Sequence, residues 1–239
     1  MGRRKQTRGN CVYCQREMSR SGLAKHLKSC EARQQAIAEA NGTKRTRQKL
    51  YHLQVADAWR GDYWLHLEIR GKAKLEDLDD YLRAIWLECC GHLSAFTIGE
   101  TRYTQIFDDG FSWGEEKSMD VAVDKVLAIG MSIPYEYDFG TTSELVIKVV
   151  DVREGRPTTE NPIALMARNA APEFVCMECG KPATHMCIQC LSEREDERCE
   201  LCDEHTAVHP HDDYGEPMVL VNSPRIGMCG YDGPAEPPY

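Results

Sequence analysis

The most constraining feature of the sequence is a dense array of cysteines and histidines near its C-terminal end. From Cys176 to His211 the spacing is C-x2-C-x7-C-x2-C-x8-C-x2-C-x2-H-x3-H-x-H. A C-x2-C pair makes a tight turn that lets both sulfurs face one metal ion, and two tetrahedral zinc ions need eight ligands. Cysteines that merely fill a core would not recur three times with a two-residue gap. The array therefore predicts a two-zinc module over residues 173–213.

The spacing favours a cross-brace, in which alternate ligand pairs share one zinc ion. Only seven residues separate Cys179 from Cys187, which is tight for two pairs that close on the same ion. The predicted ligands are Cys176, Cys179, Cys199 and Cys202 for the first ion, and Cys187, Cys190, His205 and His209 for the second. A sequential pairing stays open, as does His211 in place of His209. In either case four protein ligands fill the coordination sphere of each ion, so neither ion has an open position for catalysis.

A second metal-binding pattern, C-x2-C-x11-H-x3-C, lies near the N-terminus. Its ligands are Cys11, Cys14, His26 and Cys30. Met18 and Leu23 stand where a ββα zinc finger places its two apolar core residues, so this segment resembles a CCHC variant of that finger. Ser19 or Ser21 is expected to cap a helix that carries His26 and Cys30 on one face. With the C-terminal array, this finger predicts three zinc ions per chain.

The net charge of −9 is distributed unevenly. Residues 1–49 carry 13 Lys or Arg and three Glu, a net +10, whereas residues 50–172 have a net −9 and residues 173–213 a net −8. A basic segment on an acidic body favours a polyanion as partner, although the segment could also rest on its own acidic body. The candidate phosphate contacts are Arg3, Arg4, Lys5, Arg8, Lys25, Lys28, Lys44, Arg45, Arg47 and Lys49.

Base readout by the finger is expected to be weak. In the docking mode of ββα fingers, helix positions −1, 3 and 6 contact bases, and here they are Ser19, Gly22 and Lys25. Gly22 has no side chain to reach a base, and a serine discriminates poorly between bases. The predicted nucleic-acid binding is therefore only weakly sequence-specific.

The central part of the chain, residues 50–153, indicates an α+β domain. Tyr63–Ile69 alternate as in a half-buried strand, and Leu75–Cys89 follow helical spacing. A strand over 94–103, a short helix over 119–127 and a hairpin over 132–152 are expected next. The predicted fold class is α+β: a central antiparallel sheet with packed helices, flanked by an N-terminal ββα-type zinc finger and a C-terminal cross-brace zinc domain.

Three segments of this domain carry a family resemblance. Tyr135–Gly140 (Y-E-Y-D-F-G), Gly91–Phe96 and the strand Tyr51–Val55 are similar to the Ri-plasmid open-reading-frame-three-like domain, also found as an insertion-element passenger labelled TnpR-like. The resemblance implies a mobile-element context and carries over no activity. Members usually continue with Asp-x-Trp-x-His, where this chain has Thr141–Leu145. The ligand order of the C-terminal array also resembles B-box-like fingers, whose metals are structural and whose surfaces bind proteins.

Several other residues are expected to be structural. The acidic pairs Asp79-Asp80, Asp108-Asp109 and Glu115-Glu116 are interpreted as solvated turns or helix faces. A hydrogen bond within the fold is the expected role of Asp138. Cys89, Cys90 and Cys229 lack ligand spacing and are interpreted as core thiols.

The predicted organisation has six parts. They are a basic disordered arm (1–10), the finger with its basic helix (11–49), the central domain (50–153), a linker (154–172), the two-zinc module (173–213) and a docking tail (214–239). No apolar stretch follows the first basic residues and no apolar run is long enough to cross a bilayer, so we expect neither a secretory signal nor a membrane span. Paired cysteines at metal spacing then favour a reducing cytoplasm and no membrane contact.

These features favour a non-enzymatic zinc-binding accessory or regulatory protein. Its basic N-terminal finger would meet nucleic acid, and its acidic C-terminal module would meet a protein partner. Two alternatives remain: a protein–protein adapter without nucleic-acid binding, and an enzyme with an unrecognised site in the central domain. Binding of nucleic acid by residues 1–49 would distinguish the favoured function from the adapter. Carboxylates from distant segments that converge in a pocket would favour the enzyme.

Overall fold

The computed structural model describes residues 7–105, 116–193, 199–211 and 215–239. The strands are β1 (Arg8–Cys11), β2 (Glu17–Ser19), β3 (Gln48–Asp57), β4 (Trp64–Arg70), β5 (Ser94–Ile98), β6 (Thr101–Thr104), β7 (Glu116–Ser118), β8 (Ser132–Tyr137), β9 (Ser143–Gly155), β10 (Ile163–Asn169), β11 (His185–Met186), β12 (Glu200–Leu201) and β13 (Met218–Val219). The helices are α1 (Arg20–Ser29), α2 (Glu31–Asn41), α3 (Leu75–Leu82), α4 (Val123–Val126), α5 (Ile188–Glu193) and α6 (Asp203–Thr206), with a π-helical turn η1 (Arg83–Leu87) after α3.

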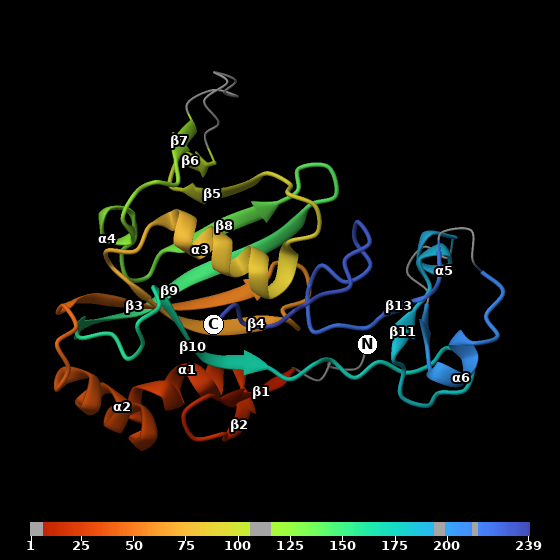
Figure 1. Cartoon of the computed structure of the whole chain (residues 1–239), viewed down its shortest axis with the longest axis horizontal. Coiled ribbons are helices and arrows are strands. Elements are labelled where there is room, and N and C mark those ends of the chain that lie inside the picture. Colours follow the sequence, from red (N-terminus) through yellow and green to blue (C-terminus); the bar gives the residue numbers. More distant parts are fainter. Residues whose placement is uncertain (1–6, 106–115, 194–198, 212–214) are drawn as a thin grey trace.

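Ten of the strands form one sheet in the order β2-β1-β10-β4-β3-β9-β8-β5-β6-β7. Neighbouring strands are antiparallel except for β6 and β7, which are parallel. A separate sheet, β12-β11-β13, lies to one side of the large one (Figure 1), and in it β11 and β12 of the C-terminal module pair with β13 of the tail. The predicted α+β class is confirmed. No helix in the described ranges is long and apolar enough to cross a membrane.

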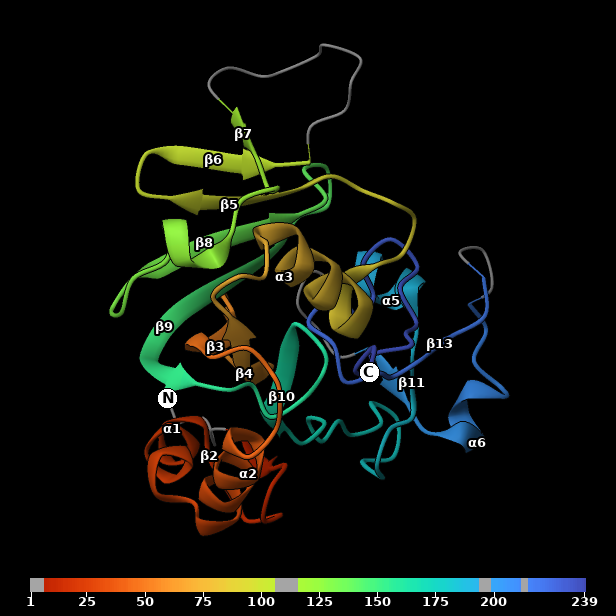
Figure 2. The ribbon, with the colours of Figure 1, turned by 60° about the vertical axis from the view of Figure 1, so that its left-hand side comes forward.

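Strand β4 is covered on both faces, whereas its alternation predicted a strand with one exposed face. Leu65, Leu67 and Ile69 belong to the main core with α3. His66 and Glu68 point to the opposite face, where α1 and α2 cover them, and both are nearly inaccessible to solvent. Figure 2 shows α1 and α2 on one side of β3, β4 and β10 and α3 on the other. The N-terminal helices thus complete the core.

The N-terminal finger is continuous with the large sheet. Strand β1 pairs with β10, and β10 pairs with β4, so the range 154–172 that was predicted to be a linker contains a central strand. Close approach is possible because Gly9 has no side chain: a Cβ there would lie 2.6 Å from the ring of Trp64. Trp64 in turn shares a buried cluster with Leu23 and Leu27 of α1.

Several predicted elements are shorter in the structure. The helix expected over Leu75–Cys89 changes at Arg83 into η1 and ends at Leu87. The strand expected over 94–103 is the hairpin β5–β6, because Gly99 takes a positive φ of 61° and turns the chain. The helix expected over 119–127 reduces to the single turn α4.

A pair of buried histidines lies beneath α1. Nε2 of His52 is 2.8 Å from Nδ1 of His66, and Nε2 of His66 is 3.1 Å from the carbonyl oxygen of Arg20. Since a carbonyl only accepts, His66 carries its proton on Nε2 and accepts at Nδ1 from His52. Both of these hydrogen bonds therefore form when the two rings are neutral. Burial accordingly lowers the pKa of His52 to about 3 and that of His66 to about 4.

This pair predicts a loss of stability in mild acid. Below the unfolded pKa of about 6.5 the histidines of the unfolded chain bind protons that the folded histidines do not bind, so the protein becomes less stable from there down to about pH 3. We expect a loss of roughly 2–3 kcal/mol between pH 7 and pH 5.5, beyond that of a His52→Gln/His66→Gln variant. Urea unfolding of both proteins at each pH measures it, and the metal ligands contribute equally to both. Parallel curves would contradict the prediction.

Candidate metal centres

Four groups of cysteine and histidine side chains lie close enough to share a metal ion. Within each group the ligand atoms are all within 4.8 Å of one another. Zn–S bonds of about 2.3 Å and Zn–N bonds of about 2.0 Å give a tetrahedron with edges of about 3.8 Å between sulfurs and about 3.5 Å from sulfur to nitrogen. All twelve cysteines are free thiols. The groups fit a tetrahedral thiophilic metal and hold no disulfide.

The first group is the predicted finger, with all four expected ligands together. Sγ of Cys11 is 4.0 Å from Sγ of Cys30, and Sγ of Cys14 is 3.2 Å from Nε2 of His26. The hydroxyl of Ser19 caps α1 by accepting from the N–H of Gly22 at 3.2 Å. This cap fixes the start of the helix, whose last turn carries His26 toward the cysteines of the hairpin.

The second and third groups belong to the C-terminal array. One contains Cys176, Cys179, Cys202 and His205, and the other contains Cys187, Cys190, His209 and His211. In the former, Nδ1 of His205 lies 3.4 Å from Sγ of Cys176 and 3.3 Å from Sγ of Cys202. In the latter, Sγ of Cys190 lies 3.4 Å from Nε2 of His209 and 3.2 Å from Nδ1 of His211. Ligand pairs alternate between the two groups along the chain, which is the order of a cross-brace.

Cys199 was predicted to be a metal ligand, but in the structure it lies in neither group. Its carbonyl accepts from the N–H of Cys187 at 2.8 Å, and its thiol is buried. Burial raises the pKa of this thiol to about 12, which favours a neutral, apolar side chain. The short helix α6 instead begins after Cys202 and returns His205 to it, since the N–H of His205 donates to the carbonyl of Cys202. The third pair is therefore Cys202-x2-His205, and both His209 and His211 complete the fourth.

Thiol acidity differs between these centres. Although burial acts to raise it, backbone N–H groups of Cys202, Cys179 and Glu178 lower the pKa of Cys176 to about 6. Burial raises the pKa of Cys11 to about 11. Only thiolates bind zinc, so Cys11 has to lose a more tightly held proton than Cys176 does before it can act as a ligand.

The fourth group was missed by the sequence reasoning. It contains Cys89, Cys90, His92 and Cys229, and the expectation that these cysteines are core thiols is wrong for Cys90 and Cys229, which are exposed. The local signal was a Cys-Cys-x-His run. Its fourth member lies 137 residues after His92 and comes close only because the tail folds back onto the central domain.

Comparison with known proteins identifies the family of this chain. Residues 49–212, more than half of the chain, match the plasmid pRiA4b ORF-3-like proteins. The chain belongs to this family. The match begins at β3 and runs through the last ligand of the C-terminal array, so it extends beyond the resemblance over residues 50–153 and leaves out the finger.

Two further comparisons accompany this one. The crystal structure of protein of unknown function MM3350 from Methanosarcina mazei Go1 is similar over 73% of this chain and 95% of that chain, with 18% identity and a TM-score of 0.45. The search of curated proteins found no match.

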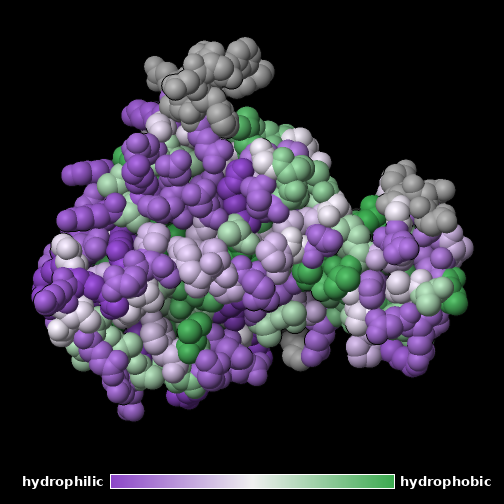
Figure 3. All heavy atoms as spheres, viewed as in Figure 1, coloured by the Kyte–Doolittle hydropathy of each residue, from purple (hydrophilic) through white to green (hydrophobic). Residues whose placement is uncertain are grey.

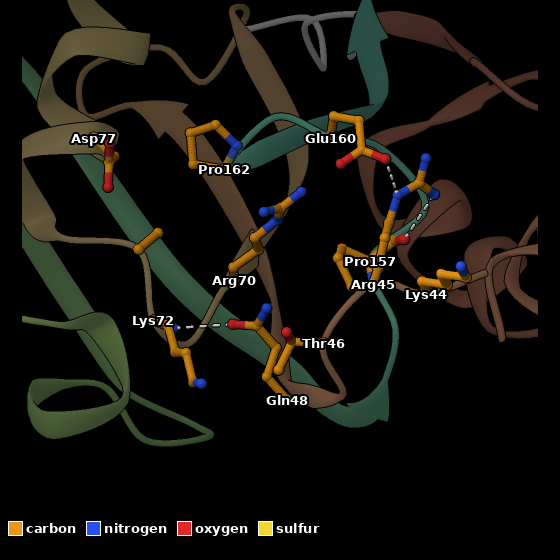
Figure 4. Close-up of a pocket in the computed structure, with 11 residues that line it drawn as sticks. Lys44, Arg45, Thr46, Gln48, Arg70, Lys72, Asp77, Pro157, Glu160 and Pro162 are labelled. Carbon is orange, nitrogen blue, oxygen red and sulfur yellow. Dashed lines mark hydrogen bonds and ion pairs between the residues drawn. The ribbon is translucent and has the colours of Figure 1, made fainter.

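The pRiA4b ORF-3-like protein also has a basic groove at one end of its large sheet. The groove measures about 520 Å³ and opens where β3 begins and β4 ends. Its lining includes the cations Lys44, Arg45, Arg70 and Lys72 and the acids Asp77 and Glu160. Figure 4 shows Arg70 in the middle of the wall and Arg45 turned to Glu160, which accepts from its Nε at 2.6 Å.

The predicted phosphate contacts fall into three sets by their placement and ion pairing. Arg3, Arg4 and Lys5 lie outside the described residues. Arg8, Lys28 and Arg45 pair with Glu17, Asp151 and Glu160 respectively. The remaining four are exposed and make no ion pair within the described ranges; they are Lys25, Lys44, Arg47 and Lys49.

One acidic pair differs from its expected solvated role. Asp79 is fully buried, and its carboxylate accepts from Ser94 at 2.6 Å, Tyr135 at 2.7 Å and Gln105 at 3.1 Å. Burial raises its pKa. The carboxylate joins α3 to β5 and β8, so its role is to hold the central fold together. Asp108, Asp109 and Glu115 lie outside the described residues.

Proposed function

We propose that this protein is a non-catalytic accessory protein whose zinc-held fold presents a basic surface to nucleic acid. The observation that carries the proposal is the groove lined by Lys44, Arg45, Arg70 and Lys72, together with the neighbouring exposed cations Arg47 and Lys49. These side chains come from the basic segment 44–49 and from the end of β4. They give a positive surface to a chain of net charge −9.

The metal groups support a structural role for zinc. Each offers four protein ligands of the soft and borderline kind that zinc prefers, which leaves no open coordination position. The finger group braces α1 against the sheet, and the C-terminal groups hold a module with only short strands. Zinc therefore organises surfaces in this proposal and takes no part in a reaction.

The same geometry favours binding with little sequence preference. The hydroxyl of Ser19 is occupied by its own helix, and Gly22 has no side chain to reach a base. Lys25 is exposed, and a single lysine contact gives little discrimination between bases. Phosphate contacts then make the main contribution to the affinity, and this contribution depends strongly on salt concentration.

We expect duplex and single-stranded DNA to bind weakly and with strong salt dependence. If three to five cations reach phosphates, log K should fall against log salt with a slope of about −3 to −4.5 on duplex DNA. Fluorescence anisotropy at increasing salt measures this slope. Lys44→Ala/Arg47→Ala/Lys49→Ala should reduce the slope by about 2–3, since each lost phosphate contact removes about 0.9.

The matched control removes three exposed cations from elsewhere on the fold. Lys117, Lys125 and Lys148 lie on β7, α4 and β9, and all three are exposed. Their triple alanine variant lowers the net charge equally and should leave the slope close to that of the unaltered chain. Equal slopes for both triple variants would show that the groove is not the binding surface. An absence of binding by the unaltered chain at low salt would refute nucleic-acid binding.

A protein partner for the C-terminal module is the second candidate function. The module has a net charge of −8 over residues 173–213 and still exposes apolar side chains. Val175 and Leu191 are more than a third exposed, Val208 is 75% exposed, and apolar atoms are visible at the outer edge of the module in Figure 3. The family name refers to a plasmid, and we include an association with mobile elements in the proposal.

A further inference from the structure

The fourth cysteine–histidine group lies where the C-terminal tail meets the central domain. Cys89 and Cys90 follow η1, and His92 precedes β5. Cys229 comes from the tail, which returns to the large sheet after the C-terminal module (Figure 1). Neither the predicted fingers nor the proposed nucleic-acid surface includes these residues.

The atoms of this group have the spacing of a tetrahedral site. Sγ of Cys90 lies 3.6 Å from Sγ of Cys89 and 3.6 Å from Sγ of Cys229. Nε2 of His92 is 2.9 Å from Sγ of Cys90 and 3.4 Å from Sγ of Cys229. The sulfur–sulfur distances are close to the edge of about 3.8 Å that zinc thiolates require. They are also far longer than a disulfide bond of about 2.05 Å.

Contacts on both sides of Cys229 hold the tail in register with the site. The hydroxyl of Ser223 donates to the carbonyl of Trp86 in η1 at 2.6 Å. Arg225 is fully buried and donates to the carboxylate of Asp138 at 2.7 Å and to Ser143 at 3.0 Å. On the other side of Cys229, Tyr231 is buried. The thiol of Cys229 is therefore placed by the surrounding fold.

The backbone of Cys229 is also unusual. Its φ is 50°, a left-handed conformation that few non-glycine residues adopt. Gly227 and Gly230 next to it also have positive φ, at 77° and 67°. For the non-glycine residue Cys229 this conformation costs of order 1 kcal/mol or more, and it persists where the surroundings require it. Here the turn directs the thiol of Cys229 toward Cys90 and His92.

A catalytic thiol–histidine–carboxylate relay fits these atoms poorly. In such a relay the carboxylate binds the imidazole nitrogen opposite the thiol and so orients the ring. Here the thiol of Cys90 and the carboxylate of Asp138 both approach Nε2 of His92, the latter at 3.5 Å. Three thiols that converge on one another and on a single ring nitrogen form a ligand set instead.

We propose that Cys89, Cys90, His92 and Cys229 bind a fourth zinc ion that fastens the C-terminal tail to the central domain. Three thiolates and one imidazole match a closed Cys3His zinc site. Three thiolates around Zn²⁺ leave one net negative charge, and the guanidinium of Arg225 lies 3.4 Å from Sγ of Cys89, where it offsets that charge. The tail thereby links the central domain to the C-terminal module through the metal.

Metal content tests the site directly. We expect four zinc ions per chain by mass spectrometry of protein purified without chelator, and three for Cys229→Ser. Cys229 is exposed, so the substitution should leave the fold intact. Cys199→Ser is the matched control, because Cys199 is the one cysteine outside the four groups, and it should retain four ions. Three ions in both the unaltered chain and Cys229→Ser would overturn the proposal, as would a Cys90–Cys229 disulfide.

Release of the tail provides a second readout. A protease under limiting conditions should cleave the tail, residues 215–239, at least several-fold faster in Cys229→Ser than in the unaltered chain. Removal of zinc by a chelator should abolish the difference. Equal cleavage rates in the zinc-loaded proteins would show that the metal does not fasten the tail. DNA binding serves to separate the two proposals, since Cys229→Ser leaves the groove unchanged and should bind DNA like the unaltered chain.

Discussion

Cys202→Ser should release at least one metal ion and unfold residues 173–213, while the central sheet stays folded. Cys202 belongs to the group that includes Cys176, Cys179 and His205, and its loss leaves that ion with three protein ligands. Structural zinc sites contribute about 10–16 kcal/mol of apparent binding free energy in small fingers at pH 7. The largest effect expected for any single substitution in this chain is therefore at a ligand of this kind.

The module has little else to hold it together. Its buried residues are mainly the cysteines themselves, with Met186 and Leu201 as the buried aliphatic side chains. The strands β11, β12 and β13 have two residues each, and α6 has four. A core this small cannot compensate for the entropy of ordering the chain. The large sheet has its own core and should be unaffected.

Cys199→Ser is the matched control for this experiment. Cys199 is three residues before Cys202 in the sequence and is equally free of disulfides, but its thiol lies outside the metal groups. We expect it to keep every metal ion and to lower the stability of the module only modestly. Metal content and proton NMR of the module methyl groups measure both variants. Loss of a metal ion from Cys199→Ser, with none lost from Cys202→Ser, would restore the ligand set that spacing alone predicted.

The sequence predicted which four side chains come together in the N-terminal group but only part of the grouping in the C-terminal array, and the reason is physical. In the finger all four ligands lie within 20 residues, so local spacing determines which side chains can meet. In the array three cysteine pairs compete for two ions, and the choice between Cys199 and His205 depends on the hydrogen bonds of β12 and α6. Spacing carries no information about those bonds. The alternating order of ligand pairs in a cross-brace is nevertheless common to the predicted array and to the array in the structure.

The tertiary arrangement was the least predictable part of the fold. Periodicity located β3, β4, β8 and β9, because their side chains alternate. It could not show that β10 pairs with β1 and joins the finger to the sheet, since that strand lies among prolines and polar residues. Nor could it place Cys229 beside Cys90, because the tail is positioned by a buried arginine–aspartate pair. Long-range contacts of this kind leave no local pattern.

Glu68→Gln should destabilise the large sheet by about 3–5 kcal/mol, the usual penalty when one partner of a buried ion pair is removed. Glu68 lies on β4 and is 4% exposed. Its carboxylate accepts from Arg33 of α2 at 2.9 Å and from Arg153 of β9 at 2.6 Å and 2.8 Å. The amide keeps the shape of the side chain but removes the negative charge that lies between the two guanidinium groups.

A matched pair on the surface separates burial from the loss of the ion pair itself. Arg45 and Glu160 make an equally short contact of 2.6 Å, but the side chain of Glu160 is 78% exposed. Water replaces the lost carboxylate there, so Glu160→Gln should change stability by no more than about 1 kcal/mol. Urea unfolding of both variants, followed by the fluorescence of the buried tryptophans, measures the two effects.

A further variant, Glu68→Leu/Arg33→Leu, removes the carboxylate together with one guanidinium and should recover part of the loss, because only Arg153 then lacks a counter-charge and it is 21% exposed. Equal effects at the buried and exposed sites would mean that the N-terminal helices are held to the sheet by apolar contacts and metal alone.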